Sequence, residues 1–473
     1  MKADHPHIKM VQSMTDRQYR IEEDSLGPVR IPAEALYGPQ TQRALENFVI
    51  SDRRLPQGFI RALTIIKLAA AETNMELGLL DKKKGEAIAS CAQKILQEGY
   101  DDQFLVSVFQ TGSGTSTNMN VNEVICGLAR QMGVELSAND HVNLGQSSND
   151  VIPTALHLAT ALGLRDVLRP SLELLAGIVR KKGAEYSDVI KTGRTHLMDA
   201  LPIRLQAELD GWAAQIDDCI HRLDSAMPRL SSLALGGTAV GSGVNCHPEF
   251  PTRAIAGINS LTGLSCTVSA SFYKSLSSLG TAVEISGHLR GTAIALMKIA
   301  NDLRWMNSGP LAGLGEIVLP ALQPGSSIMP AKVNPVIPEA VCMAAVQVIG
   351  NDTVVALAAQ SGNFQLNTML PVAAANLLDS IDLLAGAAAL LAKKAIAGMK
   401  INREVCSEAV ARNPILVTAL NLRIGYLASA RIAKRAMAES RPILEIALEE
   451  TDLTRSELIE LLDPTTLADG GKK

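Results

Sequence analysis

Aromatic side chains are scarce in this sequence, and their scarcity argues against several all-β architectures. Phe, Tyr and Trp together make up 3% of the 473 residues, whereas Ala and Leu are abundant. Strands of β-sandwiches favour aromatic and β-branched residues, while Ala and Leu are strong helix formers. The composition therefore predicts long, closely packed helices.

Clustered metal ligands and paired cysteines are also missing. The seven cysteines are scattered and include no Cys-x-x-Cys pair, and no group of His, Asp or Glu has the spacing of a metal site. A disulfide framework is not expected, so reduced thiols in a cytoplasmic compartment are the default. No metal site is predicted.

Strong charge and long uncharged apolar runs are absent as well. The formal net charge is −4, and no basic run could follow a phosphate backbone, so we expect no nucleic acid partner. No apolar stretch reaches the roughly 18 uncharged residues of a membrane helix, and Met1–Arg20 lacks the apolar core of a secretory signal. A membrane partner is not expected either. Walker loops, GxSxG elbows and GxGxxG turns after a strand do not occur.

What the sequence does contain is apolar residues at three- and four-residue spacing, which predicts helices. Residues 21–55 carry many Pro and Gly and are expected to be extended or to form short turns. Helices are expected over 59–77, 82–99, 150–184, 202–232, 274–307, 335–360 and 367–397. The last five are long and follow one another, which predicts a five-helix bundle.

Several of these helices are apolar on more than one face, for example over 340–349. Such helices must be buried within a large domain or against other subunits, so we predict an oligomer with a helical core. After residue 399 the helices become shorter and more charged, with a capping-box pattern at Thr454–Glu457. We divide the chain into an N-terminal mostly helical domain (1–146), a central long-helix bundle domain (147–403) and a small C-terminal helical domain (404–473).

Three polar loops, each leading into a helix, carry the first functional signal. Gly112–Asn118 precedes a helix expected near Asn120. Gln146–Asp150 precedes Pro153, which we place in the first helical turn. Gly325–Pro330 leads to Asn334-Pro335, which resembles a cap followed by the first helical residue. Ordinary N-capping explains any one loop, but three helix N-termini together could hold a small dicarboxylate.

The third loop also contains Lys332 and Asn334, a cation and a neutral donor. Together they would stabilise an enediolate, the dianion formed when a proton leaves the carbon next to a carboxylate. A serine in this loop could be the base, provided that N–H donors and Lys332 favour its alkoxide.

A fourth polar element, Gly193–His196, precedes a helix expected to begin at Pro202. His196 lies beside Arg194 and Thr195 and is a candidate for handling a leaving group. Glu339 could orient His196. It could equally be an ordinary acidic residue in the first turn of a helix, where the helix dipole favours it.

The segment Gly325–Pro335 resembles the signature loop of the aspartase/fumarase superfamily, and the resemblance extends over nearly the whole chain. It also includes Leu36–Gly38, Gln40–Arg43, Thr111–Glu123, Gln146–Asp150, Gly193–His196, Gly236–Gly241 and Gly362–Asn367. The resemblance implies a mainly α, three-domain subunit whose long central five-helix bundle assembles into a tetrameric helical core. It also implies that each active site of the homotetramer is built from three subunits and needs no cofactor.

The resemblance further implies a role for each residue of the site. Ser326 would be the base, and His196, paired with Glu339, would serve the leaving group. The substrate would be bound by Ser113, Thr115, Ser147, Ser148, Asn149, Thr195, Ser327, Lys332 and Asn334.

Within the superfamily, most segments are closest to the class II fumarases of the tricarboxylic acid cycle. They include Thr111–Thr115, Asn139–Asn143 and His247–Phe250. The segment Lys332–Glu339 instead resembles aspartases, and Ser137-Ala138 and Leu311 depart from the fumarase pattern. The leading prediction is therefore the reversible hydration of fumarate to L-malate. The alternatives are aspartate ammonia-lyase, a lyase for a substituted aspartate, and a non-catalytic scaffold.

Overall fold

The computed structural model of the chain describes residues 18–471, so most of Met1–Arg20, in which we predict no secretory signal, lies outside the described residues. The chain forms two compact units. The first comprises residues up to 168, 222–290 and 347–383, and the second comprises 169–221, 291–346 and 384 onward. Four long helices contribute residues to both units: α8 (Leu205–Leu230), α11 (Gly280–Met306), α12 (Val336–Gln360) and α13 (Leu370–Leu390).

The first unit is built around α3 (Gln57–Glu76). Residues Phe59 to Ala71 of α3 are all buried except Arg61, because most of this stretch is apolar. Helix α3 packs against α4 (Lys82–Glu98), α6 (Ser148–Gly163) and α9 (Phe250–Thr262). This helical core therefore supports the N-terminus of α6, where one of the predicted substrate loops ends.

The rest of the first unit consists of short strands and further helices. The strands β1 (Tyr19–Asp24) and β2 (Gly27–Pro32) form an antiparallel hairpin. The other elements are α2 (Pro39–Asn47), η1 (Asp101–Gln103), α5 (Thr115–Gln131), η2 (Ala138–Val142), η3 (Leu164–Leu168), β5 (Ser232–Leu233), β6 (Thr267–Val268), α10 (Phe272–Ser277), β8 (Gly362–Asn363) and β9 (Leu366–Asn367). Within this unit, Asp352 of α12 accepts a hydrogen bond from Ser286 of α11 at 2.7 Å, which ties the two long helices together.

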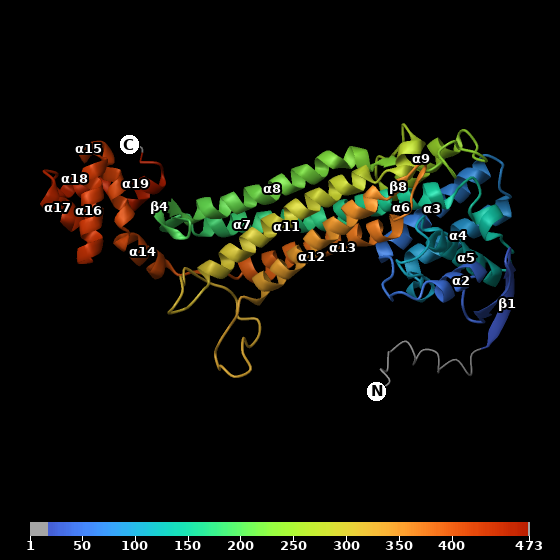
Figure 1. Cartoon of the computed structure of the whole chain (residues 1–473), viewed down its shortest axis with the longest axis horizontal. Helices are drawn as coiled ribbons and strands as arrows, with labels where there is room; N and C mark the ends of the chain where they lie inside the picture. The colour runs from blue at the N-terminus through green and yellow to red at the C-terminus, as the bar shows by residue number, and fades with distance from the viewer. Residues whose placement is uncertain (1–17, 472–473) are drawn as a thin grey trace. The chain divides into compact units, whose positions relative to one another are not determined.

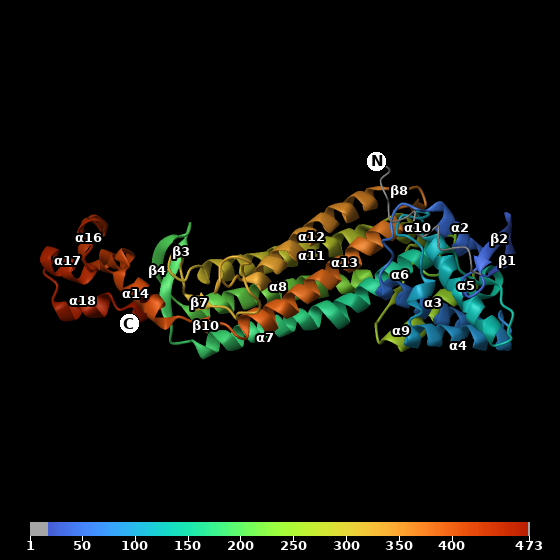
Figure 2. The same cartoon turned by 90° about the horizontal axis from the view of Figure 1, so that it is seen from below.

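In the second unit, α7 (Arg169–Glu185) runs beside its portions of the long helices (Figure 1). Arg180 pairs with Asp217 of α8, and the Lys298 ammonium of α11 lies 5.8 Å from the centre of the Trp212 ring. Two small antiparallel sheets lie next to each other in this unit (Figure 2). They pair β3 (Ile190–Thr195) with β4 (Met198–Arg204), and β7 (Ile317–Val318) with β10 (Lys400–Ile401).

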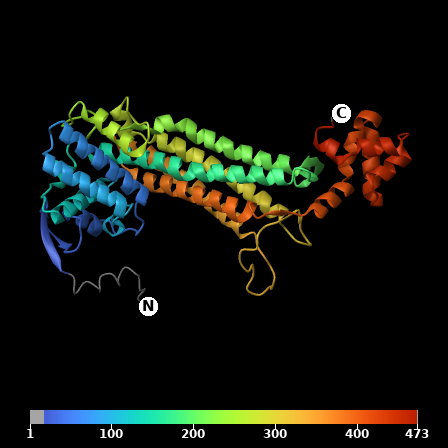
Figure 3. The ribbon, with the colours of Figure 1, turned by 180° about the vertical axis from the view of Figure 1, so that it is seen from behind.

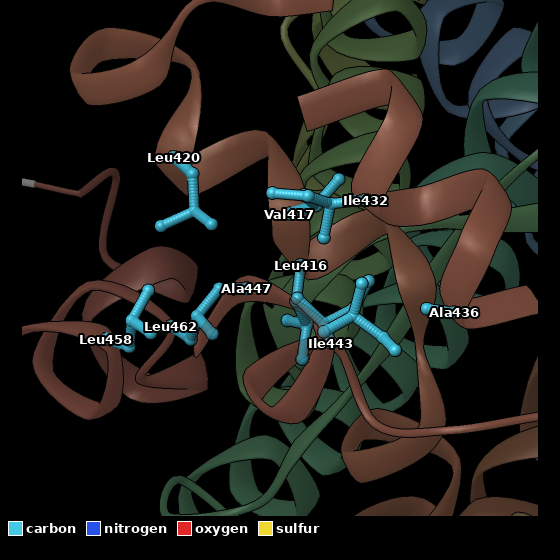
Figure 4. Close-up of a cluster of buried hydrophobic side chains, with 10 residues drawn as sticks. Leu416, Val417, Leu420, Ile432, Ala436, Ile443, Ala447, Leu458 and Leu462 are labelled. Carbon is cyan, nitrogen blue, oxygen red and sulfur yellow. The ribbon is translucent and has the colours of Figure 1, made fainter. Parts of the chain in front are cut away.

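The end of the second unit has a hydrophobic cluster of its own, built mainly from leucine and isoleucine (Figure 4). The helices of this last part of the second unit are η4 (Leu391–Ile396), α14 (Arg403–Arg412), η5 (Pro414–Leu420), α15 (Asn421–Ile424), α16 (Tyr426–Glu439), α17 (Ile443–Glu450), α18 (Arg455–Leu461) and α19 (Pro464–Ala468). Helix α18 begins with the predicted capping box of Thr454 and Glu457. The mainly α fold with long helices is confirmed, while the division into three domains stays a prediction.

Some of the expected helix positions are wrong. Residues 21–55, predicted to lack helices, contain α2. Residues 202–204 belong to β4, and α8 starts at Leu205. Pro153 lies inside α6 rather than in its first turn, because the helix already begins at Ser148.

Three helical segments are long and apolar enough to cross a membrane when up to two charged residues are allowed in an 18-residue window. The windows in Ser148–Glu185 and Leu370–Ile396 are 67% buried within the protein, but the window in α12 is only 33% buried. Helix α12 exposes Met343, Val346 and Leu357, each by more than 60%. An exposed apolar face of this kind is typical of association surfaces, and the oligomer stays a prediction.

Candidate active site

The first predicted loop ends at the N-terminus of α5, in the first unit. Helix α5 begins at Thr115, earlier than the expected start near Asn120. Gly114 adopts a left-handed backbone conformation with φ 75°, which is favourable only for glycine and turns the loop into the helix. The hydroxyls of Ser113 and Thr115 lie 2.8 Å apart and share a hydrogen bond.

The second loop is capped by its own side chains. The Ser147 hydroxyl accepts the N–H of Asn149 at 3.2 Å, and Asp150 accepts the N–H of Ser147 at 2.9 Å. The Asn118 amide of α5 donates to Ser148 Oγ at 3.0 Å, so the two loops are neighbours. The first unit therefore brings together five of the predicted substrate-binding residues: Ser113, Thr115, Ser147, Ser148 and Asn149.

Asp150 anchors this second loop to the segment 236–239. Its carboxylate accepts the N–H groups of Gly236 and Thr238, each at 2.9 Å, and the Asn149 amide donates to the carbonyl of Ala239 at 2.8 Å. Complete burial raises the pKa of Asp150 to about 6, although the backbone N–H donors favour the charged form. These contacts hold the loop in one conformation.

The third loop, 325–334, lies in the second unit and projects from the helices of that unit (Figure 3). Its two ends are joined. The N–H of Gly325 donates to the carbonyl of Lys332, and the Asn334 amide donates to the carbonyl of Gly325, both at 2.8 Å. The prediction that Asn334 caps the next helix is wrong, because α12 begins at Val336 and the Asn334 side chain closes the loop instead.

Ser326 occupies a turn that supplies N–H donors to its hydroxyl. Its Oγ accepts the backbone N–H of Ile328 at 3.2 Å and that of Met329 at 3.0 Å. Two N–H donors aimed at one oxygen stabilise negative charge on that oxygen. Ser327, its neighbour, makes no hydrogen bond with another described residue. The local geometry therefore favours Ser326 over Ser327 as the base.

A cavity of about 710 Å³ lies beside this loop in the second unit, lined in part by Lys332, Asn334 and Glu339. The Lys332 ammonium donates to Asn334 Oδ1, so these two predicted ligands of a carboxylate are held side by side. Arg304 and Asn402 line the same cavity and were missed. The sequence signal for Arg304 was weak, since an Arg near the end of a helix is usually a solvated surface residue.

Thr195 and His196 lie at the exposed tip of the β3–β4 hairpin, also in the second unit. His196 and Leu197 form the turn with φ 57° and 61°. Positive φ is uncommon for residues other than glycine and is unfavourable for leucine, and such strain at a polar site is typical of functional turns. Neither His196 nor Glu339 forms an ion pair with another residue of the part of the chain described here.

A buried ion cluster fixes the base of this hairpin. Glu316, which is 2% exposed, binds Arg194 through both carboxylate oxygens and lies 3.0 Å from the Lys191 ammonium. Burial alone would raise the pKa of Glu316, but Arg194 and Lys191 hold it below its usual range. Since Glu316 directly precedes β7, the cluster connects the His196 hairpin to the strand from which the third loop departs.

Comparison with known proteins agrees with this fold. A family model described as "Lyase" matches residues 27–350, and one described as "Fumarase C C-terminus" matches residues 416–469. The "Fumarate hydratase class II 2" of Pseudomonas aeruginosa is 56% identical over 459 residues, which are 97% of this chain and 100% of that protein. The chain therefore belongs to the aspartase/fumarase superfamily of lyases.

Solved structures give the same result. A class II fumarase from Schistosoma mansoni has a TM-score of 0.94 at 36% identity, and the match covers 96% of this chain and all of that one. A structure from Brucella melitensis titled "fumarate lyase:delta crystallin" and bound to cobalt has a TM-score of 0.91 at 42% identity, over 95% of this chain and all of that one. The predicted superfamily and the resemblance to class II fumarases are confirmed.

Proposed function

We propose that this protein catalyses the reversible addition of water to fumarate to give L-malate. The class of enzyme, a carbon–oxygen lyase, is confirmed by relatives named fumarate hydratase at 45–56% identity. The observation that carries the residue assignment is the Ser326 hydroxyl, which accepts two backbone N–H bonds in the loop that also holds Lys332 and Asn334.

In the dehydration direction, the Ser326 alkoxide removes the C3 proton of L-malate. The electron pair of the broken C–H bond moves into the adjacent carboxylate, which becomes an enediolate. Lys332 and Asn334 hold this carboxylate and stabilise the added charge. The second step breaks the C2–O bond: His196, with its charge supported by Glu339, gives a proton to the leaving hydroxyl, and water and fumarate result.

The remaining polar residues bind the substrate without taking part in proton transfer. Ser113, Thr115, Ser147, Ser148 and Asn149 are at two neighbouring helix N-termini, where a dicarboxylate is favoured by the helix dipoles and by N–H and hydroxyl donors. Thr195 and Ser327 would complete the site. No cofactor has a part in this mechanism.

The active enzyme in this proposal is a cytoplasmic homotetramer of three-domain subunits, with each site made by loops from three chains. The exposed apolar face of α12 supports the assembly. The absence of an ion pair for His196 and Glu339 within the described part of one chain supports a pair formed between chains.

Gly325 lies where the two ends of the loop 325–334 come into close contact, and this contact leaves no room for a side chain at position 325. A Cβ atom at this position would lie 2.5 Å from the carbonyl oxygen of Lys332. This distance is too short for the two ends of the loop to keep their hydrogen bonds. Gly325→Ala is therefore expected to lower kcat/KM by about 10² while leaving the melting temperature within a few degrees, because the loop is exposed. Steady-state kinetics and a thermal melt measure the two effects. Unchanged kinetics would contradict a role in catalysis for the close contact between the loop ends.

The substrate is tested by following absorbance in the fumarate band with L-malate, L-aspartate and argininosuccinate supplied in parallel. The proposal expects turnover with L-malate alone. Turnover of aspartate instead would favour the ammonia-lyase, which the aspartase-like segment Lys332–Glu339 suggests. Absence of turnover with every substrate would favour a scaffold.

A further inference from the structure

The side chain of Lys67 is fully buried in the first unit, next to the segment that leads into the second substrate loop, 146–150. It is 0% exposed, and apart from Thr64 the surrounding stretch of α3 from Leu63 to Ala71 is apolar. Its ammonium donates to Asn143 Oδ1 at 3.0 Å and to Gln146 Oε1 at 2.9 Å, both in the segment that leads into Ser147. Burying an ammonium costs free energy, which an apolar side chain at this position would avoid, so a purely structural role is a poor explanation.

A series of hydrogen bonds leads from Lys67 through Asn143 and Asn118 to Ser148, and the ammonium determines which group donates in each of them. An ammonium donates and never accepts, so Asn143 must turn its Oδ1 toward Lys67. The Asn118 amide then donates to the same Oδ1 at 3.1 Å, and its Nδ2 also donates to Ser148 Oγ at 3.0 Å. The Asn143 Nδ2 donates to the carbonyl of Gln146 at 3.1 Å, which agrees with this orientation.

Ser148 Oγ accepts a hydrogen bond from Asn118, so the single proton of the Ser148 hydroxyl is not used in that bond and can be donated to another group. A hydroxyl in this state is a donor to an anion. If Asn118 were turned over, its Oδ1 would attract that proton, and the hydroxyl would offer the substrate only lone pairs. The direction of the network therefore decides whether Ser148 attracts or repels a carboxylate.

We propose that Lys67 is a positioning residue that orients the Ser148 hydroxyl as a donor to a substrate carboxylate through Asn143 and Asn118. The inference rests on the proposed function, which places Ser148 in the dicarboxylate site. Asp150, at the start of α6, attracts the Lys67 ammonium, whereas burial lowers the pKa of Lys67 to about 7. The buried carboxylate therefore helps to keep the donor form of Lys67 populated at neutral pH.

The test compares Lys67→Met, which keeps the length and packing of the side chain but removes its donors, with the parent protein. KM for L-malate and the Kd for succinate, a dicarboxylate that cannot react, are expected to rise about 10-fold, with kcat changing less than about 3-fold. Lys182→Met is the matched control, because Lys182 is another buried lysine, held by Glu185 on α7. It should leave KM and Kd unchanged.

A double-mutant cycle distinguishes a specific effect of Lys67 on the Ser148 hydroxyl from a general destabilisation of the substrate loop. In the Ser148→Ala background, Lys67→Met should have little further effect on the succinate Kd, because both changes act through one hydroxyl. Equal effects in both backgrounds, or an unchanged Kd, would overturn the inference. If Lys67→Met does not fold, Lys67→Gln is measured in the same way and should keep part of the affinity through its amide donor.

The outcomes also distinguish this inference from the proposed function. Loss of succinate affinity in Lys67→Met, in a parent protein that does not turn over L-malate, would reject the hydratase while retaining the positioning role. Malate turnover in the parent, with normal succinate binding in Lys67→Met, would reject the positioning role alone. A parent that neither turns over L-malate nor binds succinate would reject both.

Discussion

Ser326→Ala lowers kcat for L-malate dehydration about 10³-fold in our account, because the variant has no base to remove the C3 proton. The loss should appear in kcat rather than in KM, since the ligands that hold the carboxylates remain. The neighbouring Ser327→Ala should lose much less activity, because Ser327 lacks the two N–H donors that support an alkoxide at Ser326.

Two controls keep this result interpretable. Ser407→Ala removes an exposed hydroxyl on α14 and should match the parent in rate. Gel filtration of Ser326→Ala should show the parent assembly, because the change removes one hydroxyl and leaves the exposed apolar face of α12 intact. A Ser326→Ala enzyme with the parent's kcat would mean that another group is the base.

Lys332→Met is expected to lower kcat about 10²-fold to 10³-fold, because the fixed cation that stabilises the enediolate is lost. KM should rise less than kcat falls, since the charge on the substrate carboxylate is larger after deprotonation than before. Steady-state kinetics with L-malate measures both parameters.

The matched control for Lys332 is Lys434→Met, which removes an exposed ammonium from α16. It should leave kcat and KM as in the parent. A Lys332→Met enzyme that binds L-malate weakly but keeps its kcat would place Lys332 in ground-state binding only and would contradict its role at the enediolate.

The long helices and the polar loops could be predicted because their signals are local in the sequence. Apolar residues at three- and four-residue spacing placed α3 and α4 within a few residues of their observed ends. Ser147 and Asp150 form a capping box, so the start of α6 depends on residues that are adjacent in the chain.

Other features depend on distant contacts and left no local pattern. The N-terminus of α2 has no cap of its own. Its N–H groups at Gly38 and Gln40 are satisfied by Glu123, more than 80 positions away. The β3–β4 hairpin turns at His196 and Leu197, which lack the Asn-Gly or Asp-Gly pair that usually marks such a turn.

Lys67 illustrates a signal that was present but could not be interpreted from sequence. A lysine in a mostly apolar stretch of helix is unusual, since lysine is almost never fully buried without a partner. Its partners Asn143 and Gln146 come from another segment, so only the fold shows that the ammonium lies beneath the substrate loop.

The central claim is that Ser326 of one chain acts on a dicarboxylate together with His196 of another. It is tested most directly by co-expressing Ser326→Ala and His196→Asn, each inactive alone, and purifying the mixed tetramers through two different tags. Random mixing gives roughly one quarter of the sites an intact serine and an intact histidine, so about that fraction of the parent's activity should return. Mixed tetramers no more active than the separate variants would contradict a site shared between chains.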